Sequence, residues 1–337
     1  LYEDTDFAPL FPAVGPPGLP PWRLALVTVM QFLENLSDRQ AADAVRARID
    51  WKYALGLELT DPGFDASVLS EFRTRLVAGG AEAQLFETLL ARCRSRGLLK
   101  AGGRQRTDST HVLAKVRALN RLEVVGETLR HALNALAVAA PDWLRPRLAP
   151  EWAERYGPRV DDYRLPSGQQ ERIALAETIG RDGMRLLTAV YAPVAPTWLR
   201  EIPAIETLRQ VWVQQYTPTD GLVHWRSAAD VPPASIFISS PYDPDARYAK
   251  KRETSWVGYK VHLTETCDDD TPHLITHVET TQAPLVDSDV TTAIHQALQA
   301  QDRLPTTHFV DTGYVDADLL VTSQRDFGVD LLGPPPA

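Results

Sequence analysis

The chain has 337 residues, of which 44 are acidic and 35 are Lys or Arg, so its formal net charge at pH 7 is −9. Apolar residues make up 44% of the chain and aromatic residues 8%, and there are only two cysteines, which excludes collagen-like, largely disordered and disulfide-stapled proteins. The acidic balance argues at first against a nucleic-acid partner, because proteins that bind nucleic acids usually carry a basic surface.

The length predicts about two domains. Residues 1–21 are rich in Pro and acidic residues, and we expect an extended arm there. Over residues 22–100, apolar side chains recur at helical spacing and predict a small all-helical domain. Ser37 and Gln40 predict a capping box, and Asp65 predicts the cap of a later helix. The apolar run at 24–33 is too short to cross a membrane, so we expect a cytoplasmic protein without a membrane partner.

Over residues 101–337 the pattern predicts a second domain, of the α+β class. A short strand is predicted at residues 105–113, with Asp108 in its middle, and a helical insert at about 115–235. Strands follow from Trp256 and at 273–281, then a helix capped by Asp287, a strand at 306–311, a helix at 316–327 and a strand at 329–332. Without the insert, this order is the beginning of a ribonuclease-H-like fold, a mixed sheet covered by helices.

Two aspartates stand out by their positions in this order. Asp108 lies within the first strand and Asp311 at the end of the fourth, and the proposed sheet order makes these strands neighbours. Carboxylates are suitable ligands for Mg²⁺ or Mn²⁺, and two ions about 3.5–4 Å apart can stabilise both oxygens of a phosphoryl displacement. An Asp beside Ser or Thr is also typical of a turn or helix cap. The sequence alone leaves both interpretations open.

Basic residues flank both aspartates. Nine Lys or Arg residues lie between Arg92 and Arg121 against one acid, Asp108, and a second basic segment leads into the strand at Trp256. Such residues can neutralise DNA phosphates, although solvated helix faces are the common alternative. The residues that we interpret as DNA contacts in these segments are Arg104, Arg106, Arg247, Lys250, Lys251, Arg252 and Lys260.

Three further residues have two open interpretations. Trp256 can stack on an exposed base or serve as a core aromatic. The helix at 22–34, a tight turn and the helix from Ser37 can form a helix-turn-helix in which Arg39 and Arg46 read DNA, or an ordinary helical hairpin or dimerisation element.

His111 and His262 lie nearest the two aspartates in strand order, and we interpret both as hydrogen-bonding structural residues.

Four spaced segments together resemble a known family. Residues 67–76, 104–111, 256–265 and 310–314 are similar to the DDE transposases of bacterial insertion sequences, and more narrowly to the branch with an InsH-like helical N-terminal domain. The resemblance implies metal-dependent cleavage and strand transfer of DNA at transposon ends, with Asp108 and Asp311 as the first two acids of the triad. It also implies a two-metal Mg²⁺ or Mn²⁺ site, terminal inverted repeats and target DNA as partners, a homodimer when active, and association with the nucleoid.

The family pattern also contains a third acid, a Glu on a helix after the last strand. No residue before Ala337 matches it, and Asp318, Asp326 and Asp330 are better interpreted as helix and turn residues. A chain that ended there would bind metal weakly and catalyse poorly. Two alternatives therefore stay open: a truncated, non-catalytic transposase that only binds DNA ends, and a metal-dependent nuclease of the same fold without strand transfer.

Overall fold

The computed structural model describes residues 1–12, 18–117, 119–251 and 253–334. The chain divides into two compact units. Leu1–Gly103 and the loop Thr266–Leu274 form the first, and Arg104–Glu265 and Ile275–Ala337 form the second. Among the described residues, no helix combines the length and the apolar character that a membrane span requires.

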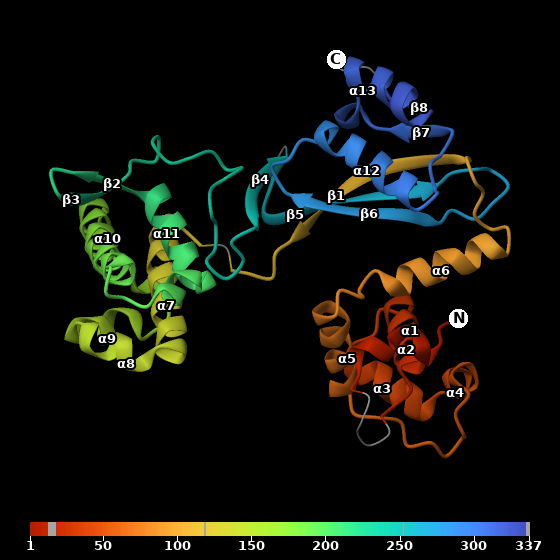
Figure 1. Cartoon of the computed structure of the whole chain (residues 1–337), viewed down its shortest axis with the longest axis horizontal. Coiled ribbons are helices and arrows are strands. Elements are labelled where there is room, and N and C mark those ends of the chain that lie inside the picture. Colours follow the sequence, from red (N-terminus) through yellow and green to blue (C-terminus); the bar gives the residue numbers. More distant parts are fainter. Residues whose placement is uncertain (13–17, 118, 252, 335–337) are drawn as a thin grey trace. The chain divides into compact units, whose positions relative to one another are not determined.

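The first unit is helical, as predicted (Figure 1). Its central helices contribute Trp51, Leu69 and Phe72 to one buried core. Its elements are α1 (Asp4–Phe7), η1 (Ala8–Leu10), α2 (Pro21–Leu33), α3 (Asp38–Ala47), α4 (Ile49–Leu55), α5 (Ser67–Ala78) and α6 (Gln84–Ser95).

The extended arm expected at residues 1–21 is not what the structure shows at its beginning. Residues 4–10 form α1 and η1, and the ring of Phe7 is fully buried with its centroid 5.8 Å from that of Phe72. The physical reason is the burial of Phe7, which draws the segment into the core despite its acidic residues. Residues 13–17 of the expected arm lie outside the described residues.

Two helix starts follow the sequence signals. The capping box of Ser37 and Gln40 is confirmed at the start of α3. The N-cap of α5 is Ala66 and not the predicted Asp65, whose carboxylate instead accepts a hydrogen bond of 2.9 Å from the backbone N–H of Ser67, the first residue of the helix. Between α2 and α3, Asn35 has φ = 54° and the N–H of Leu36 donates to the carbonyl of Gln31 at 2.9 Å. This left-handed turn makes the connection between the two helices short.

The helical insert has its own apolar core, which includes Leu129, Leu186, Leu208 and Trp212. Its main helices are α7 (Arg121–Ala139), α8 (Pro141–Leu144), α9 (Pro150–Tyr156), α10 (Gln169–Tyr191) and α11 (Pro203–Gln215), joined by the short turns η2 (Arg145–Arg147), η3 (Asp162–Arg164) and η4 (Thr197–Glu201). A hairpin of β2 (Tyr216–Thr219) and β3 (Leu222–Trp225) follows, which we did not predict.

The remaining strands of the second unit form a six-stranded mixed sheet, in the order β4-β5-β1-β7-β8 with β6 also paired to β5. β1 and β7, and β7 and β8, pair in parallel, whereas β4 and β6 pair antiparallel with β5. The strands are β1 (Arg104–Leu113), β4 (Arg247–Lys251), β5 (Thr254–Thr266), β6 (Ile275–Gln282), β7 (Thr307–Val310) and β8 (Asp330–Leu332), with α12 (Ser288–Ala300) before β7 and η5 (Thr312–Tyr314), α13 (Ala317–Thr322) and η6 (Ser323–Phe327) after it. The α+β class and the pairing of the two aspartate-bearing strands are confirmed.

One face of this sheet is buried although many of its side chains are polar. On β5, His262 and Thr264 are fully buried, whereas Val261 and Leu263 of the opposite face are only half-buried. Hydrogen bonds satisfy this polar layer: the hydroxyl of Thr107 lies 2.7 Å from both Thr264 Oγ1 and His308 Nε2. The layer therefore ties β1 to both of its neighbours.

Candidate active site

The two aspartates lie at neighbouring positions of paired strands, Asp108 in the middle of β1 and Asp311 directly after the end of β7. In the parallel register of β1 and β7, Thr107 is the partner of Val310. Asp108 is the next residue of β1 and Asp311 the next residue of the chain after β7, so the two positions follow the last paired residues. Both side chains are exposed. Carboxylates 203 positions apart in the sequence therefore meet at one level of the sheet, as predicted.

Local hydrogen bonds fix the direction of each carboxylate. Asp108 Oδ1 accepts from the backbone N–H of Ser109 at 2.7 Å, and Asp311 Oδ1 accepts from that of Gly313 at 2.9 Å. A Cβ atom at Gly313 would lie 3.1 Å from both Asp311 Oδ1 and Asp287 Oδ2. The glycine therefore leaves room for two carboxylates to approach the turn that follows β7.

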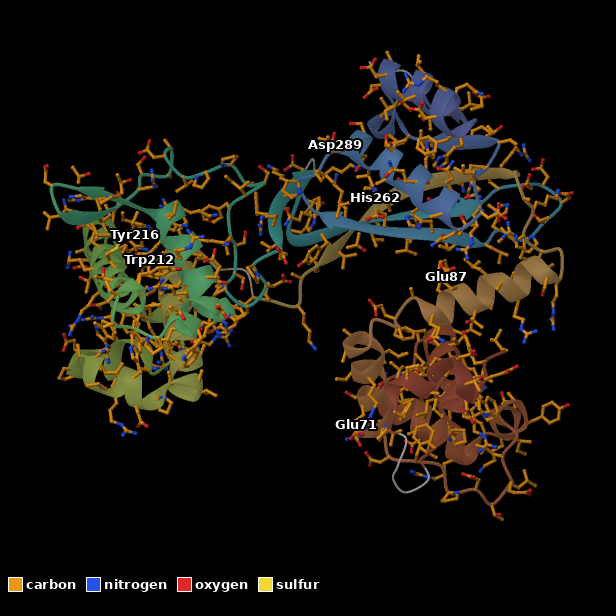
Figure 2. All side chains as sticks on the ribbon, in the orientation of Figure 1. Glu71, Glu87, Trp212, Tyr216, His262 and Asp289 are labelled. Carbon is orange, nitrogen blue, oxygen red and sulfur yellow. The ribbon has the colours of Figure 1, made fainter. Side chains whose placement is uncertain are left out.

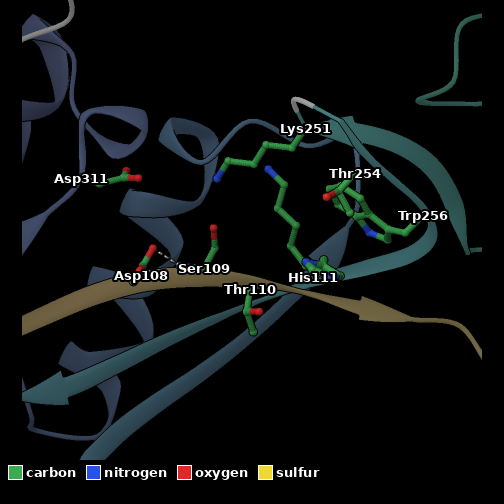
Figure 3. Close-up of a pocket in the computed structure, with 9 residues that line it drawn as sticks. Asp108, Ser109, Thr110, His111, Lys251, Thr254, Trp256 and Asp311 are labelled. Carbon is green, nitrogen blue, oxygen red and sulfur yellow. Dashed lines mark hydrogen bonds between the residues drawn. The ribbon is translucent and has the colours of Figure 1, made fainter.

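Both aspartates line a cavity of about 400 Å³. Figure 3 shows Asp108 and Asp311 at one end, Thr254 and Trp256 at the other, and the side chain of Lys251 extending between them. The lining residues are Asp108, Ser109, Thr110, His111, Lys251, Thr254, Trp256, Lys260 and Asp311. The cavity thus combines carboxylates, hydroxyls and two ammonium groups.

The two lysines of the cavity differ in their surroundings. The ammonium of Lys260 donates to Asp287 Oδ1 at 2.8 Å and to the carbonyl of Leu285 at 2.5 Å, and its side chain is largely buried. Asp287, which we expected to cap α12, makes no capping hydrogen bond, because its carboxylate is engaged by Lys260. Lys251 comes from the end of β4 and points its ammonium into the cavity (Figure 3).

Trp256 has little free surface for a base. Its side chain is only 7% exposed, its ring centroid lies 5.2 Å from that of His111, and its Nε1 donates to the carbonyl of Tyr259 at 3.3 Å. The structure favours the core-aromatic interpretation, because both the ring and its donor are already occupied.

The structure does not gather all of the predicted DNA contacts. Arg106 forms an ion pair of 2.6 Å with Glu265, Nε of Arg247 donates to the carbonyl of Ser235 at 3.2 Å, and Lys250 is exposed on β4. Arg104 begins β1, and Arg252 lies outside the described residues.

Arg39 and Arg46 belong to the helical unit. Arg46 is engaged there, since it lies 3.2 Å from Asp43 and also 3.2 Å from the carbonyl of Pro62.

The donor atoms at the two aspartates fit a hard divalent cation. Oxygen ligands from carboxylates, completed by water, are what Mg²⁺ and Mn²⁺ prefer. Within the described ranges, no group of three His, Cys, Asp or Glu side chains could hold a metal ion. Asp330 is the register partner of Thr307, at the far end of β7 from Asp311, and Asp326 pairs with Arg325 at 2.6 Å. The carboxylate of Asp287 also approaches the turn after β7, but it is paired with Lys260, so Asp108 and Asp311 are the candidate ligands at this site.

Sequence reasoning missed the role of Tyr314, which is fully buried directly behind the site. Its hydroxyl lies 2.5 Å from His262 Nδ1, and Nε2 of the same imidazole lies 3.0 Å from the hydroxyl of Thr281. The structural interpretation of His262 is confirmed. The sequence did contain a signal for this role, because an aromatic residue follows the polar turn Asp311-Thr312-Gly313 directly. If such a ring is buried, its hydroxyl needs a hydrogen-bond partner inside the protein.

Comparison with known proteins addresses the helical unit and leaves the sheet without a counterpart. Residues 1–75 match the family model described as a transposase domain (DUF772). No curated protein and no solved structure matches the chain. The match to residues 1–75 supports a transposase family for this protein.

Proposed function

We propose that the protein is a DDE-type transposase of a bacterial insertion sequence that cleaves DNA at transposon ends and transfers the strand to target DNA. The observation that supports this proposal most directly is the placement of Asp108 and Asp311 at one level of the paired parallel strands β1 and β7. The order β5-β1-β7-β8 in one mixed sheet, with β4 and β6 both paired to β5, supports a ribonuclease-H-like core. The transposase-domain match of residues 1–75 supports the same class.

Asp108 and Asp311 would hold the Mg²⁺ or Mn²⁺ ions. A bound pair of such ions supplies charge stabilisation to the attacking and leaving oxygens of a phosphodiester. Two neighbouring carboxylates repel each other when both are ionised, so the site favours a cation. The ammonium of Lys251, in the same cavity, suits a DNA phosphate next to the reacting one.

The partner in this proposal is DNA, both the terminal inverted repeats and the target, bound by a homodimer at the nucleoid. Lys250, Lys251 and the basic residues of β1 would contact the backbone near the carboxylates. Arg39 and Arg46 would contact transposon ends through the helical unit, where α2, a short turn and α3 give the helix order of a helix-turn-helix.

A second candidate is a transposase that binds DNA ends without chemistry. It is favoured by the donor set, since within the described ranges no group of three His, Cys, Asp or Glu side chains is placed to hold a metal ion. It predicts end binding that neither depends on Mg²⁺ nor leads to cleavage.

The test is a plasmid assay with the full chain. A supercoiled plasmid that carries the inverted repeats of the encoding element is incubated with Mg²⁺, and nicked, cleaved and joined products are resolved. We expect products from the natural protein and from Asp330→Asn, and none from Asp108→Asn or in the presence of a chelator.

Other results of the plasmid assay would distinguish the transposase, the non-catalytic DNA-binding protein and the nuclease. Products from Asp108→Asn at the natural rate would contradict the proposed function. Retarded DNA without any product would favour the non-catalytic candidate, and cleavage without joining would indicate a nuclease.

A further inference from the structure

Tyr314 connects the segments that carry the two aspartates. It is the last residue of η5, the turn that begins at Asp311, and its backbone N–H donates to the carbonyl of Asp311 at 3.1 Å. Its hydroxyl also lies near the side chain of Ser109, the residue after Asp108 on β1. One buried side chain therefore reaches from the turn after β7 to the neighbouring position on β1.

The donor and the acceptor can be assigned in each hydrogen bond around the Tyr314 hydroxyl. Burial is the main cause that raises the pKa of Tyr314, so its hydroxyl stays protonated and can donate one hydrogen bond. Burial is also the main cause that lowers the pKa of His262, so its imidazole is neutral and one ring nitrogen accepts. Ser109 can then donate to Tyr314, Tyr314 to Nδ1 of His262, and Nε2 of His262 to Thr281.

The other end of Tyr314 is also held. The hydroxyl of Thr291 on α12 donates to the carbonyl of Tyr314 at 3.0 Å. The ring of Tyr314 lies edge-on to that of His262, with centroids 5.6 Å apart. The backbone of Tyr314 is therefore held from α12, and its ring and hydroxyl both contact His262 of β5, while the hydroxyl also lies near Ser109 of β1.

We propose that Tyr314 is a positioning residue that holds the turn of Asp311 in register with Asp108, through hydroxyl contacts to Ser109 and His262. The inference rests on the proposed function in one respect: the spacing that Tyr314 sets is that of two carboxylates that share cations. Removal of the hydroxyl leaves the ring in the core but disconnects the turn after β7 from β1. The carboxylates then sample a wider range of separations, and cation affinity falls.

The test compares Tyr314→Phe with Tyr216→Phe in the full chain. Tyr216 is a matched control, because it is equally buried and its hydroxyl donates to the carbonyl of Ala176 at 2.8 Å. Figure 2 shows Tyr216 beside Trp212 in the helical insert. Ser109→Ala is a second variant, which breaks the same link from the β1 side without changing the ring.

The first measurement is amide hydrogen exchange without metal. We expect the exchange of the Gly313 amide, which donates to Asp311, to increase about tenfold in Tyr314→Phe, the effect of one lost hydrogen bond. Ser109→Ala should change it in the same direction, and Tyr216→Phe should leave it unchanged. Unchanged exchange in Tyr314→Phe, or an equal increase over the whole sheet, would overturn the inference.

The second measurement is Mn²⁺ affinity by electron paramagnetic resonance. We expect about tenfold weaker binding in Tyr314→Phe than in Tyr216→Phe, as is usual when a residue that orients a metal ligand is changed. Equal affinity in the two variants would also overturn the inference while leaving the proposed function intact. If the natural protein bound no Mn²⁺, the proposed function would fail, and the exchange measurement alone would decide whether Tyr314 positions Asp311.

Discussion

His295 and His308 form a buried pair beneath the strands that carry the aspartates. His295 Nε2 lies 2.8 Å from His308 Nδ1, and both side chains are fully buried. Burial lowers the pKa of His295 to about 4, and burial together with the nearby His295 lowers that of His308 to about 3. Both imidazoles are therefore neutral at pH 7, and the hydrogen bonds of His308 to Thr107 and to His295 are intact.

The pair predicts loss of stability in mild acid. The folded pKa values lie below the unfolded value of about 6.5, so the unfolded state binds more protons as the pH falls. The stabilisation is complete above pH 6.5 and is lost progressively toward the folded values. We expect the free energy of unfolding to fall by about 2 kcal/mol more in the natural protein than in His308→Asn between pH 7 and pH 5. Urea titrations at the two pH values measure this difference, and identical pH dependence in both proteins would refute it.

The strand β5 depends on one glycine where it crosses β1. A Cβ atom at Gly258 would lie 2.1 Å from the carbonyl oxygen of Val112 and 2.7 Å from the backbone nitrogen of Ala114. Both neighbours are backbone atoms, so neither can turn away as a flexible side chain would. The close approach brings the N-terminal half of β5, with Trp256 and Lys260, beside β1.

Replacement of Gly258 by Ala should therefore separate the two strands. We expect a loss of about 1–3 kcal/mol in the free energy of unfolding, the usual cost of overpacking. Gly168→Ala is the control, since its added methyl group would meet only the flexible side chain of Glu171, at 3.2 Å. Chemical denaturation of both variants checks the prediction, and equal stabilities would show that the strands accommodate the methyl group.

Elements with a repeating apolar pattern could be predicted from the sequence, and elements defined by pairing could not. The strands that carry Asp108 and Asp311 follow from their Thr and Val content. β4 was missed because Lys and Arg residues dominate it, and its extended form depends on pairing with β5. The hairpin of β2 and β3 did have a local signal, since Asp220-Gly221 adopts positive φ at both residues, 52° and 77°.

The buried face of β5 could not be predicted from polarity. The alternation of Val261 and Leu263 with Lys260 and His262 was evident, but the polar side is the one that is covered. Partners for His262 come from Tyr314 and Thr281, which are distant in sequence. The juxtaposition of the two aspartates was predictable because it depends only on strand order, whereas the polar layer that supports them depends on side-chain contacts.

At the scale of the whole molecule, the apolar residues gather in separate cores. One core belongs to the helical unit, one to the insert and one to the sheet with α12, and none of the described residues belongs to two of them. The net charge of −9 is an average over these parts, and the cavity with the aspartates still contains two lysines. Overall charge therefore does not exclude DNA at this site.

Separate cores predict separate unfolding transitions. Leu69 in the helical unit and Leu208 in the insert are both fully buried. Leu→Ala at either position should cost about 2–5 kcal/mol, through the lost apolar contact and the cavity left behind. In calorimetry of the full chain, we expect Leu69→Ala and Leu208→Ala to lower the temperatures of different transitions. A single transition lowered equally by both would show that the units unfold together.

The central claim is that Asp108 and Asp311 form one divalent-cation site, and titration of the full chain with Mn²⁺, followed by electron paramagnetic resonance, tests it most directly. The compared proteins are the natural chain, Asp108→Asn, Asp311→Asn, the double variant and the control Asp330→Asn, whose position lies at the opposite end of β7. We predict that each single variant loses binding, that the double variant loses no more than either single one, and that Asp330→Asn binds like the natural protein. Unchanged binding in either single variant, or independent losses that add in the double variant, would contradict a shared site.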